Sequence, residues 1–535
     1  MDFVTQYVET LQNTISQNLL EDARALVNAF HSTNTAYTAD CYYLEAALCY
    51  YEQNYIFALL FAALGKELDE AHPGINELLS LLIVPSETVF NYLPAGYHTL
   101  TFSHKRLRIV IHENVLDIMD YTAEQFHKAF TQLGHEVFIF HHNDFKNSSK
   151  EFMEFLKGGI DFTLIFNNAG LMLKDDLGNS LWDRFSIPCV NFLFDHPFYY
   201  EKYLKDAPKS AIFTCIDIEH VNYIKRFYPN IKKCFYMPLA GELLTPLSEG
   251  LSDSQKQRIL HEELNWNNRP IDVLYVGSLK QNFAMKMCPV AQKAFDFLLA
   301  NPIYTSEYAL ELSLKKAISL IYDQTNITEK LDKINVAELS FPSDICLQPN
   351  DSIMESLKLP EHFIRSFIED YCYIDMNINY FFRKKLIVDL VQAGIDVTVY
   401  GNGWHLDELK NNPHFHYKGL VSQRDCLCEI RNSKFVLNNM TWFKNGTHDR
   451  VHNAMLYHAI CITDDTLYLK EHFEDGRDLI FYSLDTIHEL PGKIKELLCN
   501  PEKAMEIAEN GFQKAVLTDT WNNRALELLA GIYSE

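Results

Sequence analysis

Short apolar stretches that alternate with helical stretches are the feature that most limits the folds open to this chain. After residue 105 the sequence repeatedly reads as a strand, a turn and a helix. For example, RLRIVI (Arg106–Ile111) and EVFIFH (Glu136–His141) enclose the helical segment AEQFHKAFTQLG. Apolar strands joined by helices indicate a parallel, doubly wound sheet covered on both faces, which places the chain in the α/β class.

The pattern occurs twice, which predicts two Rossmann-like domains in series. In the first, at 105–265, further strands are expected at DFTLIF, CVNFLF, AIFTCI and KCFYMPLA. The second, at 270–500, begins with IDVLYVGS and is interrupted by a mostly helical insertion at about 281–379. It resumes with IDVTVYG, HFHYKG, KFVLNN, AICITD and DLIFY, and a helical tail at 501–535 closes the chain.

The first 95 residues contain almost no strand signal. Apolar residues recur there at helical spacing, in Leu26–Phe30, Tyr42–Tyr50 and Ile56–Leu64. The last two segments carry alanines where two helices would touch, before a stop at Pro73–Gly74. They resemble a tetratricopeptide-type hairpin, which needs stacking neighbours, although a generic helical bundle fits as well. We therefore expect a small all-helical domain, 1–95, packed on the domain that comes next in the chain.

Composition and charge narrow the class of protein. The chain has 47 basic and 71 acidic side chains, a net charge of −24 that disfavours nucleic acid and anionic membranes as partners. No apolar stretch approaches the roughly 20 residues that span a bilayer, and the N-terminus does not read as a signal peptide. The twelve cysteines include no C-x-x-C pair, which is typical of reduced thiols. We therefore expect a cytoplasmic protein without a transmembrane segment.

Polar side chains gather at the predicted carboxyl ends of the strands, where open α/β sheets bind their ligands. In the first domain these ends carry His112 with Glu113, and Asp195 with His196. Each is a candidate general base for a reaction between the domains. Each pair also fits a plainer role, as a turn and helix start or as a loop. No metal site is assigned to the histidine doublets elsewhere in the chain.

The corresponding ends in the second domain favour a nucleoside diphosphate. Without a Cβ atom, Gly277 would let its own N–H and that of Ser278 approach phosphate oxygens. Gly401 and Gly403 could do the same, and Trp404 offers a flat apolar face. No G-x-G-x-x-G motif follows the first strand of either domain, which disfavours a dinucleotide cofactor. The absence of G-x-x-x-x-G-K-[ST] excludes a P-loop enzyme.

A polar segment, NGTHDRVHNAM, leads into a predicted helix and strand near the C-terminus. Thr447 or Asp449 can cap that helix, and Asp449 suits the positive end of its dipole. Capping does not explain His448, or Arg450 in a first turn where its charge is unfavourable. Arg450 and Asn453 lie one turn apart on a shared face. We interpret the segment as a phosphate or sugar site, against the alternative of a solvated helix start.

At these residues the C-terminal half resembles the CgeB-like glycosyltransferases, which have the GT-B fold. The resemblance rests on Gly446–Val451, Ala454–Met455 and Ile462–Asp464, supported by GIDVTVYGNGW (Gly394–Trp404) and FVLNN (Phe435–Asn439). It extends over about 374–515, and over 106–240 only in general style. It implies a GT-B arrangement, with two Rossmann-like domains facing a cleft, a nucleotide sugar on the second and the acceptor on the first.

The resemblance implies a metal-independent glycosyltransferase that moves a sugar to a protein or polysaccharide acceptor. No cofactor is expected, and a UDP-sugar is the favoured co-substrate. Related retaining enzymes carry two glutamates where this chain has Asn445 and Asn453, so ribose recognition and stereochemistry stay open. The candidate donor-binding residues are Gly277, Ser278, Lys280, Gly401, Gly403, Trp404, Asn439, Asn445, Gly446, His448, Arg450, Asn453, Thr463 and Asp464.

Two other functions stay open at the level of sequence. A GT-B-like protein without catalysis could serve as a scaffold that binds other proteins through 1–95, since asparagines stand where glutamates are found in relatives. A nucleotide-sugar epimerase shares the two-domain arrangement and needs no acceptor.

Overall fold

The computed structural model describes residues 3–33, 35–82, 106–113, 116–243, 265–280, 287–322, 331–334, 339, 341–342, 345–349 and 357–534. The predicted boundaries at residues 95, 105 and 281 lie outside these residues. Within them, a helical region is followed by two series of strands and helices in the predicted order.

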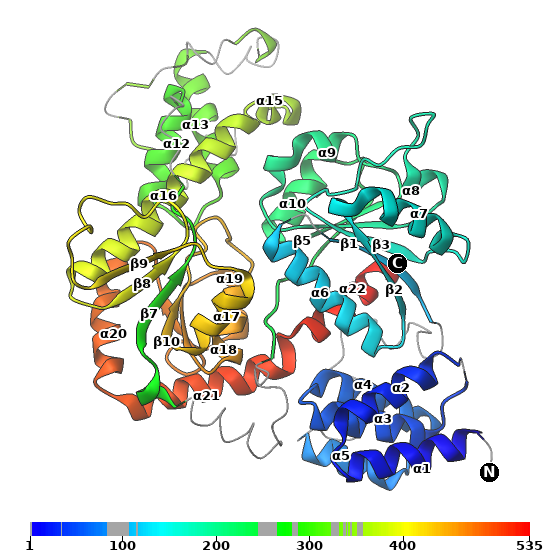
Figure 1. Ribbon diagram of the computed structural model, residues 1–535. Coiled ribbons are helices and arrows are strands. Elements are labelled where there is room, and N and C mark those ends of the chain that lie inside the picture. Colours follow the sequence, from blue (N-terminus) through cyan, green and yellow to red (C-terminus); the bar gives the residue numbers. More distant parts are fainter. Residues whose placement is uncertain are drawn as a thin grey trace.

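The described N-terminal residues are helical and lie below the first domain in Figure 1. Their helices are α1 (Phe3–Ser16), α2 (Leu20–His31), α3 (Ala39–Tyr51), α4 (Tyr55–Leu68) and α5 (Pro73–Leu81). Helices α3 and α4 form a hairpin, and small buried residues such as Ala46, Ala58 and Ala62 let them pack closely. Pro73 stands in the first turn of α5, where its missing N–H leaves no hydrogen bond unmade.

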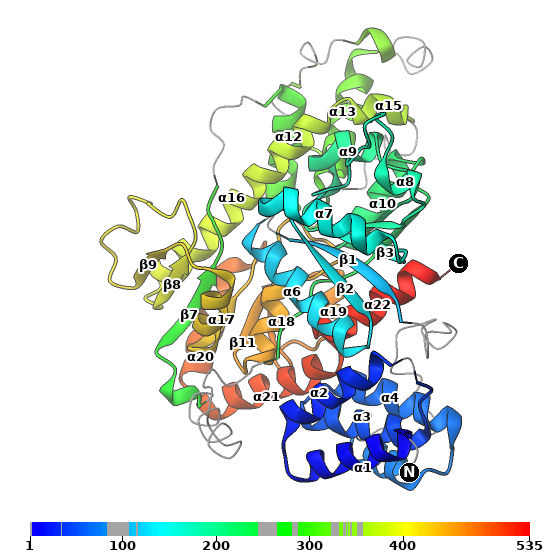
Figure 2. The ribbon, with the colours of Figure 1, turned by 45° about the vertical axis from the view of Figure 1, so that its right-hand side comes forward.

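The buried side chains of this helical region continue into the first domain. Phe57 of α4 belongs to the same buried cluster as Phe126 and Phe130 of α6 (Asp117–Gln132). Asn54, just before α4, also donates a hydrogen bond to Gln132 Oε1 at 3.2 Å. Figure 2 shows α2 and α4 directly beneath the first sheet and α22 (Trp521–Tyr533). Helix α4 therefore shares a buried cluster with the first domain, while Leu11 of α1 and Val27 of α2 belong to a separate cluster.

The first domain is built on a parallel sheet in the order β2-β1-β3-β4-β5-β6. Its strands are β1 (Arg108–Glu113), β2 (Glu136–His141), β3 (Phe162–Phe166), β4 (Cys189–Leu193), β5 (Ala211–Cys215) and β6 (Lys233–Tyr236). Besides α6, its helices are α7 (Phe145–Leu156), α8 (Leu181–Arg184), α9 (Glu201–Lys205) and α10 (Ile218–Phe227). Every residue of β3, β4 and β5 is buried, because helices or loops cover both faces of the sheet.

The second domain repeats this plan in the order β12-β11-β10-β7-β8-β9, again parallel. Its strands are β7 (Ile271–Val276), β8 (Val397–Tyr400), β9 (Phe415–Gly419), β10 (Ser433–Leu437), β11 (Ile460–Asp464) and β12 (Ile480–Tyr482). Its helices include α17 (Gln423–Arg431), α18 (Asp449–Leu456), α19 (Leu467–His472) and α20 (Leu490–Leu498). The predicted fold class, two Rossmann-like domains in the GT-B arrangement after a helical region, is confirmed.

The insertion between β7 and β8 is largely helical and reaches the first domain. It contains α12 (Pro289–Ala300), α13 (Ser306–Ile321), α15 (Glu361–Arg365) and the long α16 (Ile368–Gln392), which leads into β8. In Figure 1 these helices rise above both domains, and α15 lies close to α9. Arg226 of α10 forms ion pairs with Glu311 of α13 and Glu361 of α15. The insertion therefore bridges the two domains.

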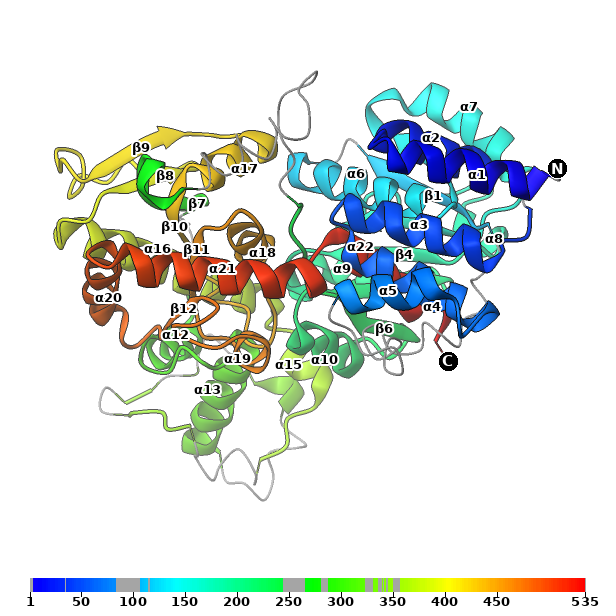
Figure 3. The same ribbon diagram turned by 90° about the horizontal axis from the view of Figure 1, so that it is seen from below.

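The predicted helical tail also joins the domains. Helix α21 (Pro501–Thr518) runs along the second domain, and α22 packs against α6 of the first (Figure 3). The ring of Trp521 lies 5.6 Å from that of Phe126. Gly241, after β6, pairs with Thr520 in an isolated parallel bridge. The chain thus crosses between the domains at two segments that lie side by side.

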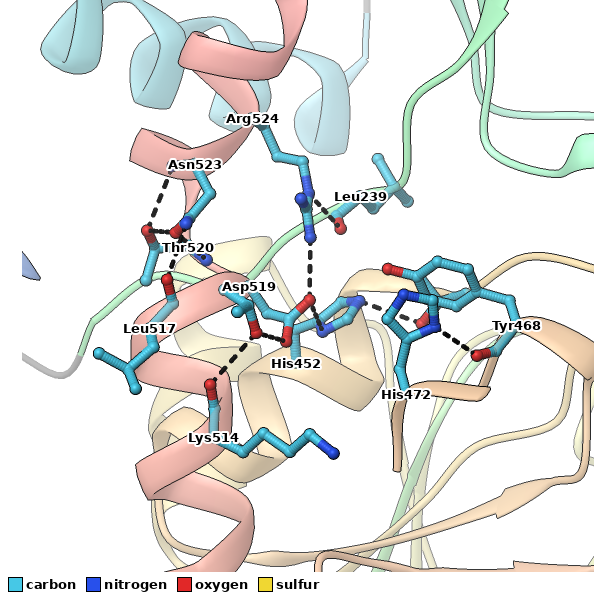
Figure 4. Close-up of polar contacts among 12 residues, drawn as sticks. Leu239, His452, Tyr468, His472, Lys514, Leu517, Asp519, Thr520, Asn523 and Arg524 are labelled. Carbon is cyan, nitrogen blue, oxygen red and sulfur yellow. Dashed lines mark hydrogen bonds and ion pairs between the residues drawn. The ribbon is translucent and has the colours of Figure 1, made fainter. Parts of the chain in front are cut away.

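A buried polar network surrounds the break between α21 and α22 (Figure 4). Arg524 donates to Asp519 Oδ1 at 2.9 Å and to the carbonyl of Leu239 at 3.3 Å. His452 of α18 places its Nδ1 3.4 Å from the same Asp519 oxygen. Thr520 caps the N-terminus of α22. These contacts fix the direction in which the chain returns to the first domain.

Short 3₁₀ turns complete the described structure, at His142–Asp144, Pro197–Tyr200, Trp266–Asn268, Leu331–Lys333 and Ile487–Glu489. None of the helices in the described part of the chain combines the length and the apolar character needed to cross a membrane.

Candidate functional site between the two sheets

The carboxyl ends of the two sheets meet where Asp217, which follows β5, lies against Gly446. The two residues form an isolated antiparallel bridge, and Asn445 N donates to Asp217 Oδ2 at 2.9 Å. Ile218 N donates in return to the carbonyl of Asn445 at 3.0 Å. A Cβ atom on Gly446 would stand 2.3 Å from the carbonyl oxygen of Ile216. The close approach of the two domains therefore requires glycine at this position.

Helix α18 begins at this contact, and its N-cap is His448. His448 Nδ1 accepts a hydrogen bond from Arg450 N at 3.3 Å, so the prediction that Thr447 or Asp449 caps the helix is wrong. The Thr447 hydroxyl is buried and pairs with His452 Nε2 at 3.0 Å. Burial alone would raise the pKa of Asp449, but the charges of His448 and Arg450 outweigh it and hold this pKa at about 2. Asp449 is therefore ionised at the positive end of the helix, where a carboxylate is stabilised.

Arg450 lies over the ends of three strands of the second sheet. Its NH1 group donates to Asn438 Oδ1 at 2.5 Å, and its guanidinium stands 5.8 Å from the centre of the Tyr275 ring. Asn438 donates in turn to Thr463 Oγ1 at 3.0 Å. Tyr275 is on β7, Asn438 follows β10 and Thr463 is on β11, so the sheet order brings them together. The partly exposed cation is hydrogen-bonded to a neutral amide, an arrangement that suits an incoming anion.

The loop after β10 is held by its own polar side chains. Asn439 donates to the Tyr482 hydroxyl at 3.3 Å and accepts from the Thr441 hydroxyl at 2.8 Å. Asp464, at the end of β11, accepts from Met440 N at 2.7 Å. Burial raises the pKa of Asp464 to about 7. Asn439 and Asp464 therefore lie at the predicted strand ends, but these hydrogen bonds are made within the protein.

The loops that follow the strands of the second sheet form its carboxyl-end edge, here called the second rim, and paired glycines let two of these loops pack on each other. Gly401 has a φ of 124°, and a Cβ there would lie 2.4 Å from the carbonyl oxygen of Gly277. At Gly403, with a φ of 89°, a Cβ would lie 2.0 Å from the carbonyl oxygen of Leu279. Trp404 is 1% exposed and donates from Nε1 to the carbonyl of Gly277 at 2.7 Å. The prediction that Trp404 offers a flat face to a ligand is therefore wrong.

Ser278 and Lys280 lie on the same edge of the second sheet. Ser278 Oγ accepts from Asn402 N at 3.1 Å, and the Ser278 carbonyl accepts from Arg383 of α16 at 2.8 Å. Lys280 is exposed, at the end of the described segment 265–280. This edge of the second sheet therefore carries a second guanidinium, that of Arg383, which was not among the residues predicted from the sequence.

Asn445 and Asn453, at the positions where the resemblance led us to expect glutamates, both lie near the contact between the domains. Asn453 is 1% exposed, and its Oδ1 accepts from the backbone N–H of Glu242 at 3.0 Å. Glu242 directly follows Gly241, where the chain leaves the first domain. The Oδ1 atom of Asn445 is buried and has no hydrogen-bond partner in the described structure. The Asn453 side chain therefore stabilises the segment that leaves the first domain at Gly241 and Glu242.

At the end of β1, His112 and Glu113 each contact a neighbouring histidine. His112 Nδ1 lies 3.0 Å from His142 Nε2, and its ring stacks on Phe140 with centroids 5.0 Å apart. Burial lowers the pKa of His112 to about 3. Glu113 Oε2 lies 3.6 Å from His141 Nδ1, and burial raises the pKa of Glu113. Of the two, Glu113 is the more accessible to a ligand, because His112 is 1% exposed.

At the end of β4, Asp195 and His196 have different surroundings. Asp195 Oδ2 accepts from the Tyr200 hydroxyl at 2.7 Å and from Asn167 Nδ2 at 3.1 Å, both within the first domain. His196 is 3% exposed, and its Nε2 lies 3.5 Å from Glu307 Oε1 at the start of α13. Burial lowers the pKa of His196 well below its usual range. Only His196 of this pair reaches the insertion of the second domain.

A small pocket lies between the loop after β4 of the first domain, the insertion, and the loop after β10 of the second domain. Its polar lining includes His196, Glu307, Asp375 of α16 and Lys444 of the loop after β10. The sequence had not marked Glu307, Asp375 or Lys444 as site residues. Lys444 directly precedes the polar segment that opens α18, so a motif extended by one residue would have included it. The two acids lie in the insertion, where no motif points to them.

Comparison with known families places part of this site in a described class. Residues 383–530 match a family model described as "Glycosyl transferase-like". The match begins within α16 and ends within α22, so it includes β8 to β12 and all of α18. No curated protein matches the chain. Over these residues the chain is similar to glycosyltransferases, the class that its sequence resembles.

Solved structures show low identity to the chain. Anabaena Alr3699/HepE, in complex with UDP and glucose, is 10% identical, with a TM-score of 0.42 over 80% of this chain and 100% of that one. A glycosyltransferase from Rickettsia africae is 9% identical, with a TM-score of 0.39 over 79% and 97%. Sucrose-phosphate synthase from Thermosynechococcus elongatus is 12% identical, with a TM-score of 0.38 over 79% and 97%. The function proposed below does not depend on these similarities.

Proposed function

We propose that this protein is a metal-independent glycosyltransferase of the cytoplasm, which moves a sugar from a nucleotide-sugar donor to a protein or polysaccharide acceptor. The match of residues 383–530 to the glycosyl transferase-like family carries the proposal, because it includes Arg450 and the loops after β8, β10 and β11. A UDP-sugar is the first donor to test.

Arg450 is the main donor-side residue in this proposal. Departure of a nucleoside diphosphate builds negative charge on the leaving oxygen, and donors already in place stabilise that charge in the transition state. Arg450 stands in the first turn of α18, so its guanidinium and the positive end of the helix act together. His448 at the N-cap and Arg383 near Ser278 extend the same polar edge. Thr463 and Asp464 support it from β11.

At the position equivalent to the second glutamate of retaining relatives, Asn453 is neutral and 1% exposed. Its Oδ1 accepts the backbone N–H of Glu242, and its Nδ2 is buried without a partner in the described structure. A buried neutral amide binds a ribose hydroxyl less strongly than a carboxylate would. We therefore propose that the donor is held mainly through its diphosphate, by Arg450.

The test is a thermal-shift panel with UDP, GDP, ADP, CMP and dTDP on the wild type and on Arg450→Ala. A ligand that binds only the folded state stabilises it by about 2.7 kcal/mol at a hundredfold excess over its Kd. One nucleotide is expected to raise the melting temperature of the wild type but not of Arg450→Ala. Arg477→Ala is the matched control, because Arg477 is an exposed arginine paired with Glu474. A panel without any shift would contradict the proposal.

The scaffold alternative needs a test that leaves the fold intact. Removal of 1–82 would expose the buried cluster that Phe57 shares with Phe126 and Phe130, so loss of a partner after truncation would not distinguish scaffold from enzyme. Donor hydrolysis by the full chain does distinguish them, since a scaffold without catalysis would show none.

A further inference from the structure

The pocket between the domains has room for a single small group. The space inside it is about 10 Å³, close to what one water molecule or one hydroxyl group needs. Lys444 donates from Nζ to the carbonyls of Pro302 and Thr441, so one ammonium group ties the insertion to the loop after β10. The same loop leads directly into α18 and Arg450. The pocket is therefore lined in part by the loop that leads into the proposed donor site.

His196 presents a hydrogen-bond donor to this pocket. Its Nδ1 accepts from Phe198 N at 3.3 Å, so in the neutral ring Nδ1 is unprotonated and the hydrogen is on Nε2. That Nε2 atom is buried and makes no hydrogen bond in the described structure. Because Nε2 already carries the hydrogen and Nδ1 is occupied by the Phe198 N–H, His196 itself is a poor general base.

Glu307 presents the complementary acceptor. Its Oε1 faces His196 Nε2 at 3.5 Å, a distance too long for a good hydrogen bond, and its Oε2 is buried without a partner among the described residues. Asp375, the other acid of the pocket, is already occupied, because it accepts from Ser306 Oγ at 3.2 Å and from the Tyr199 hydroxyl at 3.3 Å. The Glu307 carboxylate also accepts from the Thr305 hydroxyl and from its own backbone N–H. Two atoms at the pocket thus have no hydrogen-bond partner within the described structure, the donor His196 Nε2 and the acceptor Glu307 Oε2. A hydroxyl group, which can accept and donate at once, satisfies both.

We propose that Glu307 is the general base of the glycosyl transfer proposed above, that His196 is its positioning residue, and that the pocket takes the acceptor hydroxyl. The hydroxyl accepts from His196 Nε2 and donates to Glu307. As its oxygen bonds to the anomeric carbon, its proton passes to the Glu307 carboxylate. The bond from that carbon to the diphosphate oxygen breaks at the same time, and the nucleoside diphosphate leaves with the electron pair. This step inverts the configuration at the sugar.

The charges around Glu307 suit a base that works near neutral pH. Burial raises the pKa of Glu307 to about 7. Arg226 of α10 and Lys444 of the rim loop favour its charged form, while Asp375 of α16 disfavours it, and the His196 ring beside it is neutral. Because the base acts in its ionised form, the rate is expected to rise as pH increases through about 7.

Hydrolysis of the donor tests this inference without knowledge of the acceptor, since water fits the same pocket. The probe is UDP-glucose, or the glucose conjugate of whichever diphosphate stabilises the protein. Glu307→Gln keeps the size of the side chain but cannot take up the proton. It is expected to lower kcat for hydrolysis about 100-fold or more and to remove the rise in rate near pH 7. The thermal shift with the nucleotide is expected to stay as in the wild type.

Glu361→Gln is the matched control, because Glu361 is an exposed acid of the same insertion that pairs with Arg226 outside the pocket. His196→Ala is expected to lower kcat more than it changes KM, and His196→Gln to restore part of the rate through its amide N–H. Equal rates in Glu307→Gln and Glu361→Gln would overturn the inference but leave the proposed function standing. Loss of both the rate and the nucleotide shift in Glu307→Gln would also overturn it. A wild type that neither binds nucleotide nor hydrolyses donor would remove the function on which it depends.

Discussion

Gly446 shows how one residue can set the distance between two domains. Its Cα lies so close to the backbone after β5 that a Cβ would stand 2.3 Å from the carbonyl oxygen of Ile216. Gly446→Ala must therefore push the rims apart or distort one of them, at a cost of about 1–3 kcal/mol. Urea unfolding followed by tryptophan fluorescence measures the loss. The same variant is expected to weaken nucleotide binding, because Gly446 lies four residues before Arg450.

Gly492→Ala is the control for this substitution. Gly492 is in α20, where a Cβ would meet no atom within 4 Å. Alanine is expected to be neutral there, or stabilising by about 0.5–1 kcal/mol, because glycine is the weaker helix former. If Gly446→Ala is as stable as Gly492→Ala, the close approach of the two rims described above is contradicted.

The sequence predicts which polar residues lie at strand ends, but not what each one contacts. Asp464 follows from the strand pattern, because parallel strands end at one edge of a sheet, and Arg450 follows from the polar segment that opens a helix. Trp404 does not, because its burial depends on the backbone of Gly277, 127 residues away. The cap of α18 was missed for a related reason. Histidine is not a usual N-cap residue, and the hydrogen bond of the Thr447 hydroxyl to His452 depends on the folded structure.

Among the elements, strands were easier to predict from the sequence than helix partners. The strand expected at 161–166 is β3, Phe162–Phe166, since a strand buried on both faces has an unbroken apolar stretch. The helical spacing of 521–533 predicts a helix equally well, yet it does not tell which sheet that helix covers. The return of α22 to the first domain depends on contacts with distant segments, including the carbonyl of Leu239.

The break between α21 and α22 depends on a buried ion pair. Asp519 is the carboxylate partner of Arg524, which is 2% exposed, and it also faces His452. Asp519→Ala leaves this guanidinium with Glu527 and the Leu239 carbonyl, so the buried charge keeps one partner, and loss of the charged hydrogen bond costs about 1.5–3 kcal/mol. Thermal or urea unfolding measures the loss. Asp519→Asn, which can still accept a hydrogen bond, is expected to cost less.

Glu474→Ala serves as the matched control for this prediction. Glu474 and Arg477 form an exposed pair with an N–O distance of 3.1 Å. Exposed pairs of this kind contribute about 0–1 kcal/mol, so the variant should unfold almost as the wild type does. A loss in Asp519→Ala no larger than in Glu474→Ala would mean that the pair does not hold the crossing.

At the scale of the whole molecule, the insertion limits how the two domains can move. It starts and ends in the second domain, between β7 and β8, yet it contacts α9 and α10 of the first. The other connection between the domains, at α21 and α22, lies at the lower end in Figure 1, away from α12 and α13. Any movement that separates the two domains about that connection must therefore separate the insertion from the first domain. Since Glu307 and Asp375 belong to the insertion, such a movement would also take apart the proposed acceptor pocket.

Arg365 is the residue with which this coupling is best tested. Its NH1 donates to the carbonyl of Phe227 at 3.0 Å, its NH2 lies 3.4 Å from Glu201 Oε1, and its guanidinium stands 4.7 Å from the centre of the Tyr228 ring. Arg365→Ala removes all three contacts.

If these contacts contribute about 1 kcal/mol together, the state in which the insertion is separated from the first domain becomes about fivefold more populated in Arg365→Ala. Hydrogen exchange is then expected to speed up at the C-terminal end of α10 and in α15, with α7 unchanged as an internal control. Unchanged exchange in α10 and α15 would mean that the insertion does not couple the two domains.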